Sequence, residues 1–300
     1  MNSIQPWILA ARPKTLLATL APIIVGTSLS YKISGIINWP LSLLIILSSI
    51  LLQIGSNYAN DAYDFLRGAD SGSRKGPKRM VQEGHLSIDA ILNAMYFIFM
   101  VSVFIGYFLA RIGGWPIVAI GLSSIVFAII YTAGPYPLAY NGLGDVTVFV
   151  FFGIIATTGT AYLQLTDLSI NINDFIGDIF IGSAAVGCLN TAILVINNLR
   201  DIDSDKLADK KTLAVKFGAK FTCYEFALLL LINCFCYYWL AYKWENYILL
   251  ASAILILFYS FIMINKVFKF KNINLNIVLE RTAQLSFLSS ILFFISVIIW

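Results

Sequence analysis

The sequence predicts an all-α polytopic membrane protein, with nine transmembrane helices in a single bundle. Hydrophobic residues make up 59% of the 300 residues, and charged residues only 12%, about half of the usual share in a soluble domain. The apolar residues occur in runs of about 20, the length that a helix needs to cross a bilayer. Aromatic residues reach 14% without the alternation typical of an outer-membrane barrel. This composition excludes a soluble enzyme, a disordered chain, a collagen and a disulfide scaffold.

The nine expected spans are joined by more polar segments. Their approximate ranges are 15–31, 41–61, 90–110, 115–134, 145–165, 176–199, 221–242, 246–265 and 282–300. Only Arg111–Gly114 separates the third span from the fourth, which predicts a tight helical hairpin. All four cysteines lie in or beside apolar runs, so we expect small hydrophobic side chains and neither a disulfide nor a zinc site. Residues 1–300 are expected to form one transmembrane domain.

The basic residues are distributed unevenly between the two ends of the expected helices. If the N-terminus is cytoplasmic, seventeen of the 20 lysines and arginines fall in inner segments, and only Lys32, Arg111 and Lys243 fall outside. This bias follows the positive-inside rule and fits an odd number of spans. We therefore expect a multi-pass protein of the cell membrane with a cytoplasmic N-terminus and a C-terminus outside. The basic face is expected to meet anionic lipid and not nucleic acid.

Two inner loops, 61–89 and 198–220, carry 20 of the 36 formal charges. Each loop adjoins a cluster of asparagine and aspartate at the inner end of a span. Residues four apart on a helix share one face, so the acids of each cluster are expected to point the same way. The second and sixth spans run in the same direction, which places both clusters on one side of the membrane. The first cluster is Asn57, Asn60, Asp61 and Asp64, and the second is Asn197, Asn198, Asp201 and Asp205.

Several carboxylates at the carboxyl end of a helix repel one another and face the negative end of the helix dipole. A cation is therefore expected beside them, and oxygen ligands that include asparagine favour Mg²⁺. Basic residues follow each cluster, among them Lys78 and Arg79 after the first and Lys210 after the second. Such residues suit a diphosphate, whose charge exceeds what the metal neutralises. The sequence thus predicts a magnesium-dependent diphosphate site at the cytoplasmic face.

The charged residues are also compatible with simpler roles. An acidic loop balanced by its own lysines would account for the charges. It would not explain why the four-residue spacing of asparagine and aspartate occurs in both clusters, at the same expected depth in the membrane. An ion-coupled transporter would place charges near the middle of the bilayer, where the expected spans are uncharged. His85 follows Gly84 in the first loop and is more simply solvated than catalytic. Asp145 opens the fifth span, where helix capping is its simplest role.

These motifs resemble the UbiA-type intramembrane prenyltransferases. The resemblance rests on Asn60-Asp61-x-x-Asp64 and on the Asp201–Asp205 spacing, and it covers nearly the whole chain. Finer features are similar to the branch that prenylates 1,4-dihydroxy-2-naphthoate in menaquinone synthesis. They are Trp7 with Ala11-Arg12-Pro13-Lys14-Thr15, Gly76-Pro77-Lys78-Arg79 with Gly84, Tyr131-Thr132-Ala133-Gly134-Pro135 with Gly142-Leu143-Gly144-Asp145, and Asn197-Asn198-Leu199-Arg200-Asp201 with Lys211-Thr212-Leu213.

The resemblance implies a reaction and a role for each candidate residue. A polyprenyl group would pass from its diphosphate to 1,4-dihydroxy-2-naphthoate, with loss of CO₂ and diphosphate, giving demethylmenaquinone. It implies Mg²⁺ held by the catalytic acids Asp61, Asp64, Asp201 and Asp205. Asn57, Asn60, Asn197 and Asn198 would add neutral oxygens or orient the carboxylates, and Lys78, Arg79 and Arg200 would bind phosphate. Arg12 or Lys14 would pair with the naphthoate carboxylate. Tyr131, with Tyr58, Tyr63 and Tyr136, would face the allylic cation.

One departure and two alternatives accompany this resemblance. Many relatives have a further aspartate at the position of Gly68, and we expect Gly68 to end the helix, so that Asp70 leaves the helical face. A prenyltransferase for another acceptor, such as 4-hydroxybenzoate, homogentisate or haem, is the alternative within the family. An ion or quinone carrier is the alternative of a different class.

Overall fold

The computed structural model describes residues 4–68, 79–269 and 274–300. In these ranges every regular element is helical. The elements are α1 (Gln5–Ala11), α2 (Pro13–Ser34), α3 (Trp39–Leu66), α4 (Ile88–Gly113), α5 (Trp115–Ile130), η1 (Leu138–Tyr140), α6 (Gly144–Val148), η2 (Phe149–Ile155), α7 (Ala156–Asp167), η3 (Ile172–Phe175), α8 (Ile176–Leu207), α9 (Leu213–Lys243), α10 (Tyr247–Phe268) and α11 (Leu275–Ile299). The expectation of an all-α chain is confirmed.

Eight helical segments are long and apolar enough to cross a membrane among the residues that the structure describes. The ninth expected span, 115–134, contains the shorter apolar helix α5, Trp115–Ile130. Its 16 residues extend about 24 Å, less than the roughly 30 Å of a bilayer core. After Ile130 the N–H of Ala133 still donates to the carbonyl of Ile129 at 2.9 Å. Gly134 then turns the chain out of the helix with φ of 81°, and Pro135 could not continue the hydrogen-bond ladder. Nine spans therefore remain a prediction, and eight candidate spans are established.

The short helix α1 lies before the first expected span. Proline occupies the start of both α1 and α2, where its missing N–H costs no helical hydrogen bond. Between them Arg12 adopts a left-handed conformation, with φ of 53°. This turn sets α1 against α3, where the hydroxyl of Tyr58 donates to the carbonyl of Trp7 at 3.2 Å.

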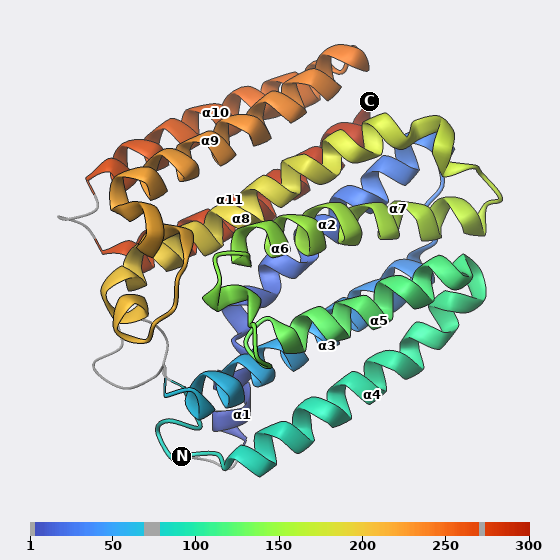
Figure 1. The fold of residues 1–300 in the computed structure, drawn as a ribbon. Coiled ribbons are helices and arrows are strands. Elements are labelled where there is room, and N and C mark those ends of the chain that lie inside the picture. Colours follow the sequence, from blue (N-terminus) through green and yellow to red (C-terminus); the bar gives the residue numbers. More distant parts are fainter. Residues whose placement is uncertain (1–3, 69–78, 270–273) are drawn as a thin grey trace.

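Helix α8 is the central element of the bundle. It packs against α9, α11, α2 and η2, and it is the most buried of the candidate spans in the described residues. Helices α3, α4 and α5 pack together as one group, and α9 and α10 pair in another (Figure 1). The carboxyl ends of α3 and α8 lie at the end of the bundle that also holds the N-terminus, and the C-terminus lies at the opposite end (Figure 1).

An unusually close backbone contact joins η2 to α8. Gly153 of η2 lies against Gly187 of α8, and small residues allow such approaches between membrane helices. The amide nitrogen of Asn190 donates to the carbonyl of Phe152 at 3.2 Å and to that of Ala18 at 3.1 Å. Its oxygen accepts from Ser286 at 2.9 Å. The side chain of Asn190 therefore ties α2, η2 and α11 to α8.

Replacing Gly153 with alanine is expected to destabilise the bundle by about 1–3 kcal/mol, the usual cost of overpacking. A Cβ at this position would overlap Cα of Gly187 and lie 3.0 Å from the carbonyl oxygen of Ser183, both of them backbone atoms. Thermal unfolding of the detergent-purified protein measures the effect. Gly177→Ala in α8 is the control, because a Cβ there meets nothing within 4 Å. Equal midpoints for the two variants would contradict the predicted contact.

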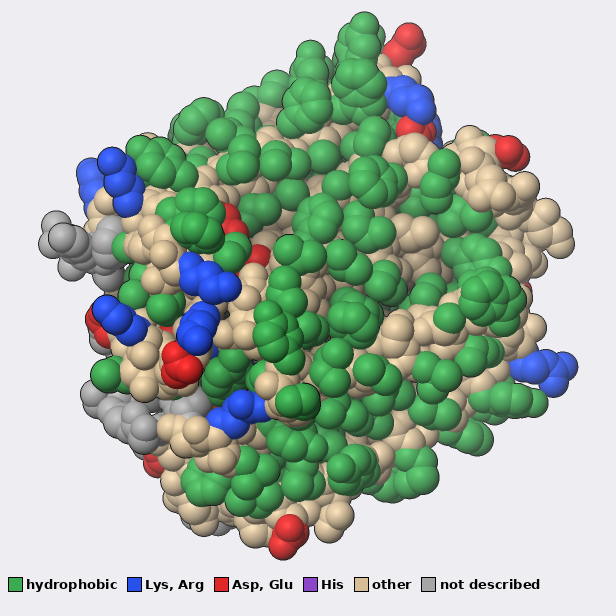
Figure 2. Space-filling view, viewed as in Figure 1, with side chains coloured by type: hydrophobic (Ala, Val, Ile, Leu, Met, Phe, Trp, Pro, Cys, Tyr) green, Lys and Arg blue, Asp and Glu red, His purple; other side chains and the backbone are tan. Residues whose placement is uncertain are grey.

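The surface separates into an apolar band and a basic end. Hydrophobic side chains cover the middle of the molecule, and lysines and arginines gather at the end where α8 connects to α9 (Figure 2). At the opposite end Lys243 pairs with Asp178, and Lys32 lies 5.7 Å from the ring centroid of Trp244. This distribution is the one that the sequence predicts for a bilayer-embedded helical bundle. Which end faces the cytoplasm remains a prediction.

Candidate active site

The first acidic cluster occupies the last turns of α3. Asn57, Asp61 and Asp64 are buried there, and Asn60 is half-buried. Helix α3 ends at Leu66, and Gly68 follows with φ of 67°. Gly68 therefore has the left-handed conformation expected of a residue that ends a helix. Asp70 and Lys78 lie outside the described residues.

Asp61 is held by backbone donors of the segment that follows the first loop. Its Oδ2 accepts from the N–H of Met80 at 3.1 Å, and its Oδ1 from the N–H of Val81 at 3.5 Å. Asp61 is only 1% exposed, so these bonds replace the water that a carboxylate otherwise needs. They also bring Arg79, the residue before Met80, to the same helix end.

Asp64 lies at the centre of the charged groups of α3. Arg79 donates to its Oδ2 in a buried ion pair, and the hydroxyl of Tyr140 donates to its Oδ1 at 2.8 Å. Lys210 and Arg12 also lie close enough to interact with it electrostatically. Four separate segments of the chain thus place a polar group toward one carboxylate.

The two asparagines of the first cluster bind neighbouring segments in this structure. Asn57 donates to the carbonyl of Ala11 at 2.9 Å and to the hydroxyl of Thr15 at 3.3 Å. Asn60 accepts from the hydroxyl of Thr132 at 3.1 Å. Asn57 therefore fixes the turn that contains Arg12. The backbone of Lys14 lies in α2, and its side chain lies outside the described structure.

The second acidic cluster occupies the last turns of α8. Arg200 donates to both oxygens of Asp201, at 2.8 and 2.6 Å, which is the bidentate geometry of a strong ion pair. The same guanidinium donates to Asn197 at 2.7 Å and to Asn276 of α11 at 2.8 Å. Asp205 lies one helical turn beyond Asp201, with Lys210 Nζ at 3.8 Å. Asp201, Asp205 and Arg200 are all buried.

Tyr140 connects the two clusters. Its hydroxyl binds Asp64, its carbonyl accepts from the N–H of Lys211 at 2.9 Å, and Lys210 Nζ lies 5.5 Å from its ring centroid. Arg67 lies 5.3 Å from the same ring. Sequence reasoning missed Tyr140, because the segment 135–144 carries no charge. Its place between the motifs Tyr131–Pro135 and Gly142–Asp145 was the available signal.

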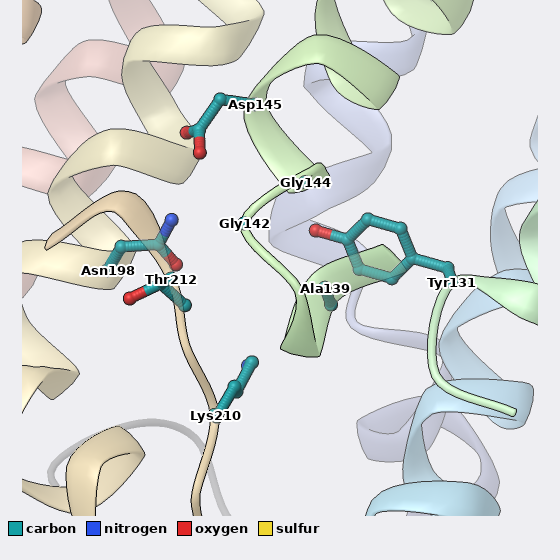
Figure 3. A pocket seen from close by; sticks show the side chains of 8 residues that line it. All are labelled: Tyr131, Ala139, Gly142, Gly144, Asp145, Asn198, Lys210 and Thr212. Atoms are coloured by element: carbon teal, nitrogen blue, oxygen red, sulfur yellow. The ribbon is translucent and has the colours of Figure 1, made fainter. Parts of the chain in front are cut away.

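A small cavity lies beside this junction. It has a volume of about 10 Å³ and is lined by Tyr131, Ala139, Gly142, Gly144, Asp145, Asn198, Lys210 and Thr212. Figure 3 shows these residues on the α5–α6 connection, on the start of α6, on α8 and on the α8–α9 connection. Tyr131 lies close enough to Asp64, Asp145 and Asp205 to interact with all three electrostatically. The cavity therefore adjoins residues of both acidic clusters.

The other aromatic candidates lie in different surroundings. Tyr58 packs against Trp7 with ring centroids 5.9 Å apart, and its hydroxyl is used by α1. Tyr136 is exposed. Among the four candidate tyrosines, the structure places Tyr131 on the cavity wall. His85 is exposed, in keeping with a solvated loop residue.

The donor set suits Mg²⁺ together with a phosphate substrate. In the described ranges no group of three histidine, cysteine or acidic side chains forms a metal site by itself. The four aspartates instead come as two pairs, with carboxylate and amide oxygens around them. Mg²⁺ typically takes one or two carboxylates and completes its shell with water and substrate phosphate. Asp61, Asp64, Asp201 and Asp205 therefore fit the metal that the sequence implies.

This fold, with two acid–arginine clusters at one end of a helical membrane bundle, is that of an intramembrane prenyltransferase. The model of the UbiA prenyltransferase family matches residues 19–276, and the chain belongs to this family. It is 34% identical to a 1,4-dihydroxy-2-naphthoate octaprenyltransferase of Haemophilus influenzae, over 99% of this chain and 97% of the relative. The enzyme of that name from Escherichia coli is 33% identical, over 98% and 95% of the two chains. The chain is thus a prenyltransferase, as its motifs predict.

Solved structures share the same fold. A UbiA homolog from Archaeoglobus fulgidus bound to GPP and Mg²⁺ superposes with a TM-score of 0.68 at 17% identity, covering 98% of this chain and 99% of that one. The apo structure of a UbiA homolog from Aeropyrum pernix K1 gives a TM-score of 0.72 at 15% identity, covering 96% and 98%. The resemblance to UbiA-type enzymes is therefore confirmed at the level of the family and of the fold.

Proposed function

We propose that this protein transfers a polyprenyl group from polyprenyl diphosphate to 1,4-dihydroxy-2-naphthoate, releasing CO₂ and diphosphate and giving demethylmenaquinol, the reduced form of demethylmenaquinone. The observation that carries the proposal is the meeting of the two acid–arginine clusters around Tyr140 and Lys210, beside the cavity that Tyr131 lines. The names of the relatives support the naphthoate as acceptor.

The diphosphate would bind between the carboxyl ends of α3 and α8. Arg79 and Arg200 neutralise Asp64 and Asp201 in this structure, and both guanidiniums can also donate to phosphate oxygens. Lys210 lies between the clusters and adds a third cation, and Lys78 is a fourth by its place in the sequence. Asn60, Asn197 and Asn198 would orient the carboxylates or add neutral oxygens.

Asp61, Asp64, Asp201 and Asp205 would hold Mg²⁺. When bound, the metal would supply neutralisation of the charge that develops on the departing diphosphate. Around it, the chain excludes water, since all four acids are 9% exposed or less. The face of Tyr131 would stabilise the allylic cation through its π electrons, an interaction of roughly 0.5–2 kcal/mol.

The acceptor would enter from the side of the α1–α2 turn. Arg12 lies at this turn and acts electrostatically on Asp64, so it lies near the reacting groups. Its guanidinium, with Lys14 as the second candidate, would pair with the naphthoate carboxylate. The apolar band of Figure 2 suits the isoprenoid tail. The basic end would face the cytoplasm of a bacterial cell, with the protein in the cell membrane.

The acceptor assay tests this proposal. Membranes containing the protein, given labelled farnesyl diphosphate, are expected to prenylate 1,4-dihydroxy-2-naphthoate but neither 4-hydroxybenzoate nor homogentisate. EDTA should reduce the product to background, and added Mg²⁺ should restore it, because the clusters offer oxygen ligands. Product from another ring acid would assign a different acceptor, and full turnover in EDTA would remove the metal from the proposal. A carrier would yield no product with any acceptor.

A further inference from the structure

Asp145 is a buried acid to which the proposed reaction gives no role. It is the second residue of α6 and is 6% exposed. Its Oδ1 is buried without a hydrogen-bond partner. Leaving a carboxylate oxygen buried and unsatisfied is costly, so this atom is poised for a donor that arrives with a ligand.

Helix capping does not account for Asp145. The N-cap of α6 is Leu143, and no side chain makes a cap hydrogen bond there. Glu225 of α9 lies close enough to interact electrostatically with Asp145.

The carboxyl group of Asp145 lies at the cavity that Tyr131 lines. Figure 3 shows Asp145 at one end of the cavity and Lys210 at the other, with Tyr131 across from Asn198. The hydroxyl of Tyr131 lies directly over Gly144, where an added Cβ would be only 3.1 Å from it. Lys210 adjoins Asp205, a residue of the diphosphate clusters. The end of the cavity at Lys210 thus lies beside the proposed diphosphate site, and Asp145 lies at the other end.

We propose that Asp145 is a catalytic residue on the acceptor side, whose free carboxylate oxygen accepts a hydrogen bond from a ring hydroxyl of the naphthoate. The inference rests on the proposed function. A phenol hydroxyl is a donor of the kind that this oxygen lacks. With a volume of about 10 Å³ the cavity holds one water-sized group, so the hydroxyl would enter it while the ring lies at its mouth.

The hydrogen bond has a defined part in the reaction. As the ring carbon that bears the carboxylate forms its bond to the prenyl carbon, the C–O bond to diphosphate breaks and the hydroxyl on the adjacent ring carbon, C1, becomes acidic. Asp145 takes up that proton. When the C–CO₂ bond breaks, its electron pair restores the aromatic ring and the oxygen regains the proton from Asp145. The balance is one C–C bond formed, with CO₂ and diphosphate released and no net proton transfer to Asp145.

Asp145→Asn is the variant that tests this role, because it keeps the shape of the side chain and removes its charge. We expect kcat/KM for the naphthoate to fall about 10- to 150-fold, the effect of losing a charge-assisted hydrogen bond. The KM for prenyl diphosphate should stay within about twofold of wild type. Asp178→Asn is the matched control, since Asp178 lies in the first turn of α8 at the opposite end of the bundle.

A second measurement separates a hydrogen bond from a merely structural effect. 1-Hydroxy-2-naphthoate and 4-hydroxy-2-naphthoate, used as competitive inhibitors, each lack one ring hydroxyl. Asp145→Asn should weaken 1-hydroxy-2-naphthoate, which keeps the hydroxyl next to the attacked carbon, by at least about 10-fold and leave 4-hydroxy-2-naphthoate within about twofold. Equal weakening of both inhibitors, or a raised KM for prenyl diphosphate, would overturn the proposal.

The controls keep this test distinct from that of the proposed function. Turnover of the naphthoate by the wild-type protein tests the acceptor alone. If another hydroxylated ring acid is the substrate, the proposed acceptor is wrong. The comparison of wild type with Asp145→Asn is then made with that acid, so the role of Asp145 is tested separately. Thermal unfolding of each variant checks the fold, and Asp145→Ser provides the same readouts if the asparagine variant is poorly produced.

Discussion

Replacing Asp205 with asparagine is expected to remove most of the prenyl transfer while the protein remains folded in the membrane. Asp205 is buried in the last turns of α8, with Lys210 Nζ 3.8 Å away. Asparagine keeps the volume but removes the charge that would bind Mg²⁺. We expect turnover to fall by at least about 100-fold, as in other sites where charge stabilisation of the transition state is lost. Asp64→Asn in α3 should give a loss of the same order, because both clusters face one diphosphate.

Asp203→Asn provides the matched control for this loss. Asp203 lies on α8 between Asp201 and Asp205, but it is exposed. Steady-state assays in membranes, with the amount of folded protein measured in parallel, should give turnover within about twofold of wild type for this variant. Near wild-type turnover in Asp205→Asn or Asp64→Asn would show that the cluster concerned is structural.

The second large effect separates the sites of the two substrates. Arg12→Gln is expected to raise the KM for the naphthoate about 10- to 150-fold, the cost of a lost charge-assisted pair of roughly 1.5–3 kcal/mol. Its KM for prenyl diphosphate should change little. Arg79→Gln should do the opposite, because Arg79 contacts Asp64 within the diphosphate clusters.

The same two variants check each other. Both replace a guanidinium with a neutral amide at one end of the bundle, so a general loss of positive charge would affect them equally. Equal weakening of both substrates by both variants would contradict separate sites. If Arg12→Gln changes neither KM, the naphthoate carboxylate binds elsewhere, and Lys14 is the next residue to replace.

The helical bundle and the two acidic helix ends could be predicted from the sequence because both depend on local patterns. Apolar runs define the spans, and a spacing of four residues puts Asn57 and Asp61 on one helical face. The length of α5 could not be read in the same way. Its apolar residues extend toward Tyr131, but the helix ends at Ile130, before the glycine and proline. Helix α1 is too short to give a periodic pattern.

The contacts between segments could not be predicted from spacing. Tyr140 reaches Asp64 across 76 positions of the sequence, and Arg200 reaches Asn276 across the same separation. Both contacts depend on how α3, α8 and α11 pack, which no local pattern contains. The sequence suggests a helix cap at Asp145, whereas the three-dimensional arrangement shows no capping bond and places its carboxyl group at a cavity.

The ion pairs of Asp64 and Asp201 have a consequence for how this chain is made. The partners of these two acids, Arg79 and Arg200, belong to the same polypeptide. A buried carboxylate without a counter-charge is strongly unfavourable, and here the counter-charge is synthesised together with the acid. The bundle can therefore fold in the membrane before ions or substrate bind. We expect the newly inserted bundle to reach its mature packing first and to acquire its ligands afterwards.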